Sequence, residues 1–142
     1  MEFMFCLCEK LNSINFSIFN ESVTNMSFLF HYCQSLANLD LSYFNTKNVT
    51  NIDYMFSNCH SLTSLDLSNF NINKVISMNY IFCACFSLKY LNLSSFNTSN
   101  IKILYATFIN CNEECNIIII NSKLKKEIKI SQKIKYKLYY FK

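Results

Sequence analysis

The chain has 142 residues, which suits one domain, and it contains no Gly, Pro or Trp. Its formal net charge of +4 hides two unlike parts: residues 1–122 carry five Lys against eight carboxylates, whereas residues 123–142 carry eight Lys and one carboxylate. This asymmetry argues against a basic nucleic-acid binder made from the whole chain. No apolar stretch reaches the roughly 18 residues of a membrane span.

A period of 26 residues organises the body of the sequence. Cys33, Cys59, Cys85 and Cys111 recur at this spacing, and Cys8 fits the same column after one deletion. The aligned apolar columns are Leu36, Leu62 and Leu88; Leu39, Leu65 and Leu91; Leu41, Leu67 and Leu93; Phe44, Phe70 and Phe96; and Phe56, Phe82 and Phe108. A fixed period of this length predicts stacked repeats that share one core.

Each repeat divides into two halves. Residues 36–42 alternate apolar and polar side chains, which is typical of a strand with one solvent-facing side. Residues 48–58 place Val49, Ile52, Met55 and Phe56 at spacings that favour a short helix. We therefore predict an α/β fold: a right-handed leucine-rich-repeat-type solenoid with one short parallel strand and one short helix per 26-residue repeat. Without Gly, Asn is expected at turn positions that require positive φ.

The repeats are expected to span residues 1–122, as about four near-complete units with partial ends. Ile117 and Ile119 fall in the columns of Leu39 and Leu41, after which the pattern stops. Residues 123–142 alternate apolar side chains with Lys, which indicates an amphipathic C-terminal cap. An attachment segment for an anionic surface is the alternative.

The unit from Cys33 to Cys59 reads C-x-S-L-x-x-L-D-L-S-x-F-N-T-x-N-V-T-N-M-x-x-M-F-x-x-C in its general form. This motif resembles the BspA-like leucine-rich-repeat surface proteins, including their mycoplasma-type lipoprotein relatives, over roughly residues 5–120. The resemblance implies a cell-surface or extracellular array that binds host or matrix proteins. The chain shows no signal peptide, so a cytoplasmic location stays open, and so does a fragment of a longer array.

The recurring thiols are best explained as packing. A Cys in every repeat suits a ladder of small buried side chains, and we expect Cys33, Cys59, Cys85 and Cys111 to be buried and unbridged. Disulfides between stacked repeats are the alternative in an oxidising compartment. The Cys spacing lacks the paired C-x-x-C of a zinc site, so no metal is expected. His31 and His60 flank the column at different offsets, which argues against a Cys–His nucleophile.

The polar side of the predicted strands is the candidate binding surface. Asp40 and Asp66 occupy one column, with Asn92 in the third repeat, and a solvated strand face is the simplest explanation of these carboxylates. The candidate ligand-binding residues are Asn38, Asp40, Ser42, Ser64, Asp66, Ser68, Tyr90, Asn92 and Ser94.

The sequence therefore predicts a non-catalytic protein-binding or adhesion module with no catalytic residues, no cofactor and no small-molecule substrate. Its expected partner is a protein ligand such as a host or matrix protein, with an anionic surface as a further partner for the Lys-rich tail. The alternative is an intracellular or structural scaffold repeat without a dedicated ligand.

Overall fold

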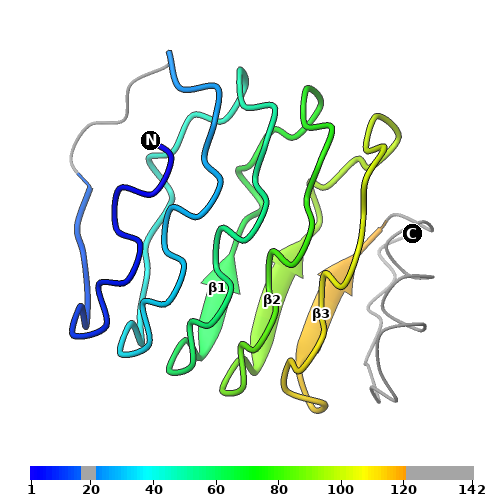
Figure 1. Ribbon diagram of the computed structural model, residues 1–142. Coiled ribbons are helices and arrows are strands. Elements are labelled where there is room, and N and C mark those ends of the chain that lie inside the picture. The colour runs from blue at the N-terminus through cyan, green and yellow to red at the C-terminus, as the bar shows by residue number, and fades with distance from the viewer. Residues whose placement is uncertain (17–21, 121–142) are drawn as a thin grey trace.

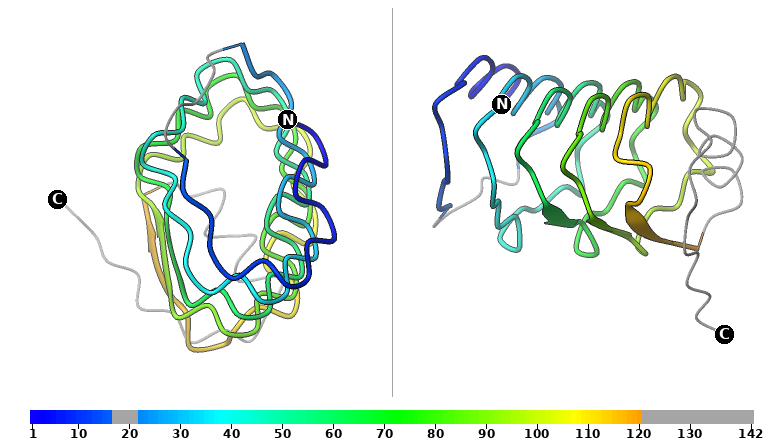
Figure 2. Two further views of the ribbon diagram at one scale, coloured as in Figure 1. Left: turned by 90° about the vertical axis from the view of Figure 1, so that its left-hand side faces the viewer. Right: turned by 90° about the horizontal axis from the view of Figure 1, so that it is seen from below.

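The computed structural model describes residues 1–16 and 22–120, which wind through successive coils that stack side by side (Figure 1). Viewed along the stack, the coils overlie one another (Figure 2). Three short strands, β1 (Ser64–Asp66), β2 (Tyr90–Leu93) and β3 (Asn116–Ile119), form one parallel sheet in the order β1-β2-β3. The predicted cap at 123–142 lies outside the described residues.

The 26-residue register predicted for the strands is confirmed. Leu65 pairs with Leu91, which pairs with Ile117, and all three side chains are buried. Asp66 faces solvent beside them. The strand predicted at residues 36–42 is absent. β1, β2 and β3 span only three or four residues each, so the predicted strands were too long.

The predicted helix in each repeat is wrong, and with it the α/β fold class of a leucine-rich-repeat-type solenoid. The described residues contain no helix. Residues 48–58 and their equivalents are here called the turn half, and in it the Thr50 N–H donates back to the Thr24 carbonyl of the preceding coil at 2.8 Å. From Ile52 on, alternate N–H groups bond to two different places. One set donates to carbonyls of the next coil: Ile52 to Ser77, Tyr54 to Asn79, Phe56 to Ile81 and Asn58 to Cys83, at 2.8–3.3 Å. The other set donates three residues back within its own coil: Met55 to Ile52, Ser57 to Tyr54 and Cys59 to Phe56.

The apolar spacing that suggested a helix also serves this run of turns. Val49, Ile52, Met55 and Phe56 are all buried, as a helical stripe would require. A helix of two or three turns is marginal alone and would bond only to itself. The turn half instead gives half of its donors to the neighbouring coil, so the hydrogen bonds join the repeats directly.

This geometry requires positive φ at regular positions. In the described residues these are Phe3, Leu7, Phe28, Tyr32, Tyr54, Asn58, Tyr80, Ala84, Ala106 and Asn110. The expectation that Asn would occupy such positions holds only for Asn58 and Asn110. The other eight are residues that pay a steric penalty in the left-handed region.

Stacking of like residues builds the core. Phe5, Phe30, Phe56, Phe82 and Phe108 form a continuous ladder with ring centroids 5.4–5.9 Å apart. The other aligned Phe column also stacks, with the ring centroids of Phe44 and Phe70 6.3 Å apart. Within residues 1–16 and 22–120, no helix is long and apolar enough to cross a membrane.

We expect Phe56→Ala to lower the free energy of unfolding by about 3–5 kcal/mol, because it removes a buried ring and leaves a cavity. Phe56 is fully buried between Phe30 and Phe82, so both neighbouring interfaces lose a contact. The matched control is Phe86→Ala, since Phe86 is 55% exposed and should contribute under about 1 kcal/mol. Urea unfolding followed by circular dichroism compares the two. Equal losses would contradict the assigned core.

Candidate functional site

The structure places all nine predicted surface residues at or near solvent. The side chains of Asn38, Asp40, Ser42, Ser64, Asp66 and Ser68 are exposed, and those of Tyr90, Asn92 and Ser94 are half-buried. Ser64 pairs with Tyr90, and Asp66 pairs with Asn92, so these members stand side by side on adjacent coils. The solvent-facing position is as predicted, and ligand binding there remains a prediction.

Three of these side chains accept hydrogen bonds from main-chain N–H groups two residues later in the chain. Asp40 Oδ1 accepts a hydrogen bond from the Ser42 N–H at 2.9 Å, and Asp66 Oδ1 accepts one from the Ser68 N–H at 2.9 Å. Asn92 Oδ1 accepts from the Ser94 N–H at 3.1 Å. Such side-chain turns stabilise a change of chain direction. The column thus has a turn-forming role that the sequence did not reveal.

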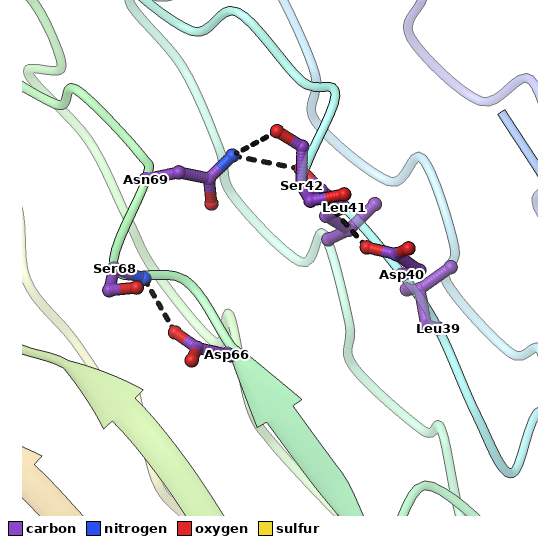
Figure 3. Close-up of a pocket in the computed structure, with 7 residues that line it drawn as sticks. All are labelled: Leu39, Asp40, Leu41, Ser42, Asp66, Ser68 and Asn69. Atoms are coloured by element: carbon purple, nitrogen blue, oxygen red, sulfur yellow. Dashed lines mark hydrogen bonds between the residues drawn. The ribbon is translucent and has the colours of Figure 1, made fainter. Parts of the chain in front are cut away.

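A shallow hollow lies between two of these turns (Figure 3). Asn69 closes one side of it, because its Nδ2 donates to the carbonyls of Leu41 at 2.9 Å and Ser42 at 3.2 Å on the preceding coil. Asp40 and Asp66 line the hollow from adjacent coils. It is therefore an acidic recess whose two coils are joined by hydrogen bonds.

The two carboxylates are stabilised in their charged form. Hydrogen bonds from the main chain and side chain of Ser42 lower the pKa of Asp40. Partial burial raises the pKa of Asp66, but hydrogen bonds from Ser68 and Asn92 outweigh it, and the net shift is downward. Both groups are therefore anionic at neutral pH, and a cationic ligand group is the complementary one.

The same shift predicts a pH dependence of stability. Because the folded pKa of Asp66 lies below its ordinary 3.8, its contribution is present above that pH and is lost as pH falls through the folded pKa. Asp66→Asn keeps the turn, as Asn92 shows, but removes the titration. We expect the variant to be slightly less stable than the parent near neutrality, where the charged carboxylate contributes, and to lose less stability in acid. Urea midpoints at pH 7 and pH 3 provide the comparison; parallel losses would contradict it.

The recurring thiols lie in the core. Cys33, Cys59, Cys85 and Cys111 are buried free thiols, as predicted. Each Sγ donates to a main-chain carbonyl of the preceding coil, at 2.8–3.2 Å, on Phe5, Phe30, Phe56 and Phe82 respectively. Burial raises the pKa of Cys33 to about 12 and that of Cys59 far above its usual range. These thiols therefore act as packing groups and hydrogen-bond donors.

We expect the buried column to resist alkylation in the native protein, because reaction needs an accessible thiolate. Cys8 is exposed and should react first. Iodoacetamide labelling followed by peptide mass spectrometry measures each site. The control is labelling in urea without reductant, where all eight cysteines should react. A shortfall confined to the column under those conditions would show disulfides there.

The two histidines are set among aromatic rings. His31 packs edge-on against Phe28, Tyr32 and Tyr54, with ring centroids 4.6–5.8 Å apart. Burial lowers its pKa, and a hydrogen bond with the Ser57 main chain only partly offsets this. His60 lies 5.0 Å from the Phe86 ring. Both rings therefore serve as packing partners for aromatic side chains in this structure.

A second surface feature was missed by sequence reasoning. Outside the core ladder, Phe3, Phe28, Tyr54 and Tyr80 stack in parallel with centroids 4.6–4.8 Å apart, and Tyr105 closes the row edge-on at 5.4 Å. We call this row the outer aromatic ladder. Phe3 and Tyr105 are exposed, and the other three are half-buried. The spacing of 26 between Phe28, Tyr54 and Tyr80 is the signal that marks it in the sequence.

The described residues place side chains of one kind at the surface at fixed spacing. In the part of the chain that the structure describes, no three His, Cys, Asp or Glu side chains converge as metal ligands. The stacked coils provide two periodic arrays. One is the column of Asp40, Asp66 and Asn92, here called the acidic turn column, and the other is the outer aromatic ladder. The molecule is thus a stack of 26-residue coils that holds columns of side chains at fixed spacing.

Residues 1–121 match the family described as "Mycoplasma protein of unknown function, DUF285", and the chain belongs to this family. The match supports the predicted mycoplasma-type repeat resemblance at the level of the family. No curated protein and no solved structure shows significant similarity to the chain.

Proposed function

We propose that the chain is a non-catalytic binding module for a protein ligand, acting at the cell surface or outside the cell. The location follows the family resemblance, and the partner class is a host or matrix protein. The single observation that carries the proposal is the outer aromatic ladder, a row of rings that reaches solvent on consecutive coils.

Aromatic rings of this kind suit protein recognition. Tyr and Phe are enriched at interfaces, since a ring offers a large contact area with little side-chain entropy to lose. Tyr54 and Tyr80 are half-buried, so the stack below holds them while part of each side chain still reaches solvent. Phe28 extends the same surface toward the first coil. A ligand therefore meets a preorganised surface.

The backbone energetics of the ladder also support a binding role. Phe28, Tyr54 and Tyr80 all have positive φ, which costs roughly 1–2 kcal/mol for a residue with a Cβ. Ring stacking returns about 0.5–1.5 kcal/mol per pair. The two terms roughly cancel, and Asn would fill these positions with less strain. Stability alone thus gives little reason for aromatic residues here, whereas ligand contact does.

We expect the double variant Tyr54→Asn with Tyr80→Asn to bind at least about tenfold more weakly while remaining folded, because Asn tolerates positive φ and only the rings are lost. Biolayer interferometry against immobilised fibronectin, laminin and collagen measures binding, and circular dichroism measures folding. The control is Tyr43→Asn, since Tyr43 is 65% exposed and lies outside the ladder.

Other outcomes would redirect the proposal. If Asp66→Ala abolished binding and the ladder variant did not, the acidic turn column would be the working surface. If the parent protein bound none of the three matrix proteins, the matrix partner would be wrong and the scaffold alternative would gain support. Equal loss in Tyr43→Asn would show that the ladder has no special role.

A further inference from the structure

His31 lies against the outer aromatic ladder where the ladder passes from one coil to the next. Its ring packs edge-on against Phe28 and Tyr54, with ring centroids 5.3 and 5.8 Å apart. Those two rings belong to adjacent coils and stack on each other at 4.7 Å. Tyr32, the next residue along the chain, packs edge-on against the same imidazole at 4.6 Å. One imidazole therefore supports both rings of a step in the ladder.

One nitrogen of this imidazole is buried without a hydrogen-bond partner. Among the described residues, no polar atom bonds to His31 Nδ1. A neutral imidazole carries one N–H donor, whereas an imidazolium carries one on each nitrogen. Protonation of His31 in this position would therefore place an N–H donor at Nδ1 with no acceptor to receive it. A buried donor without an acceptor is unfavourable, so the position suits the neutral ring.

The ionisable groups that face His31 supply no negative charge in mild acid. Tyr32 faces it from the same coil, and Tyr54 faces it from the next coil. Cys6 occupies the equivalent position on the preceding coil, and burial raises the pKa of its thiol. Phenols and thiols are uncharged in mild acid. These three groups therefore leave a protonated His31 without a counter-charge.

Carboxylates in the turn halves of the neighbouring coils have other partners. Asp53 on the next coil accepts a hydrogen bond from Ser77 Oγ at 2.7 Å, and Glu2 on the preceding coil accepts one from Ser27 Oγ at 3.1 Å. In the part of the chain that the structure describes, no carboxylate contributes to the pKa of His31. Burial lowers this pKa, and a hydrogen bond with the main chain of the next coil raises it less. The neutral imidazole is therefore the favoured form beside the ladder.

We propose that His31 is an acid-sensitive support of the outer aromatic ladder. When the imidazole takes up a proton, it turns toward water, because its buried position offers neither an acceptor nor a counter-charge, and its contacts with Phe28 and Tyr54 are lost. Both of these residues have positive φ, which is unfavourable for large side chains, so their rings depend on neighbouring contacts for their position. Protonation therefore loosens this step of the ladder. A consequence that rests on the binding function proposed above is that the ladder releases its ligand in mild acid.

The direction of the pH effect follows from the lowered pKa. The unfolded chain binds a proton at His31 more tightly than the folded chain does, so stability rises with pH across this transition. The contribution of the neutral ring is complete above its ordinary pKa of 6.5 and is lost as the pH falls through the folded pKa. Loosening of the ladder is therefore expected below pH 6.5.

A titration of the full chain from pH 7.5 to pH 5 tests this with one variant for each of its two histidines. His31→Phe keeps an aromatic ring beside the ladder and removes the titrating group. His60→Phe is the matched control, because His60 packs on Phe86, outside the ladder. Nuclear magnetic resonance of the Cε1 protons gives the midpoint of each histidine, and near-UV circular dichroism reports the packing of the tyrosine rings.

We expect His31 to titrate with a midpoint below 6.5, and the near-UV signal of the parent and of His60→Phe to change with the same midpoint. In His31→Phe this signal should stay constant. If far-UV circular dichroism shows that His31→Phe is unfolded at pH 7.5, His31→Ser takes its place, since Ser57 holds the same position on the next coil.

A His31 midpoint above 6.5 would overturn the proposal, because the aromatic rings would then stabilise the imidazolium. A near-UV signal that stays constant in the parent, or that changes equally in His31→Phe, would overturn it as well.

Binding measured at pH 7.5 and pH 5.5 against the same three matrix proteins adds a functional readout. We expect binding to be lost at pH 5.5 in the parent and in His60→Phe and to be retained in His31→Phe. Equal loss in all three would contradict the role of His31. A parent that bound no matrix protein at either pH would count against the proposed function alone, because the spectroscopic titration needs no ligand.

Discussion

The alternating use of main-chain donors in the turn half is the interaction on which the rest of the structure depends. The Thr50 N–H donates to the Thr24 carbonyl of the preceding coil, whereas from Ile52 to Asn58 every second N–H reaches the next coil and the intervening ones bond within their own coil. The bonds between coils fix the separation of coils, and those within a coil fix its path. Once both are satisfied, equivalent residues must lie above one another, and the short parallel strands on the other side follow the same register.

Self-stacking then restricts which side chains each column can hold. Rings stack favourably, and a Cys thiol reaches a carbonyl of the preceding coil, so both can recur in every coil. Carboxylates are less suited to every coil, because like charges placed side by side repel: Asp40 and Asp66 share a column, but Asn92 takes the next position. The column of Asp53 shows the solution: Ser27 and Asn79 flank it, and Ser77 Oγ and the Asn79 N–H donate to its carboxylate. In this column the neutral side chains of Ser27 and Asn79 therefore separate the charged Asp53 from further charges.

Periodicity predicted what repeats, but it could not predict the local hydrogen bonding. The register, the inward Leu65 and Leu91, and the buried Cys column follow from spacing alone, since any stacked repeat must place like residues together. The helix did not follow, because Ile52, Met55 and Phe56 point inward equally well from a helix or from serial turns. Whether the segment forms a helix or serial turns depends on whether its N–H groups find carbonyl partners in the next coil. It also depends on aromatic residues adopting positive φ, a conformation that such residues disfavour.

The candidate surface was predictable only in part, because the sequence pattern shows which side chains face solvent but not their hydrogen bonds. Alternation identified Asp40 and Asp66 as solvent-facing, yet their turn-forming bonds depend on backbone geometry. The outer aromatic ladder varies along its length in a way that matters for recognition: it is Phe at its start and Tyr54 and Tyr80 farther on. An apolar end and a hydroxyl-bearing end make the row directional, and under the proposed binding function this direction would orient a ligand that lies along it. The stack repeats the same backbone path from coil to coil, so under the proposed binding function the residues that change from coil to coil would specify the partner.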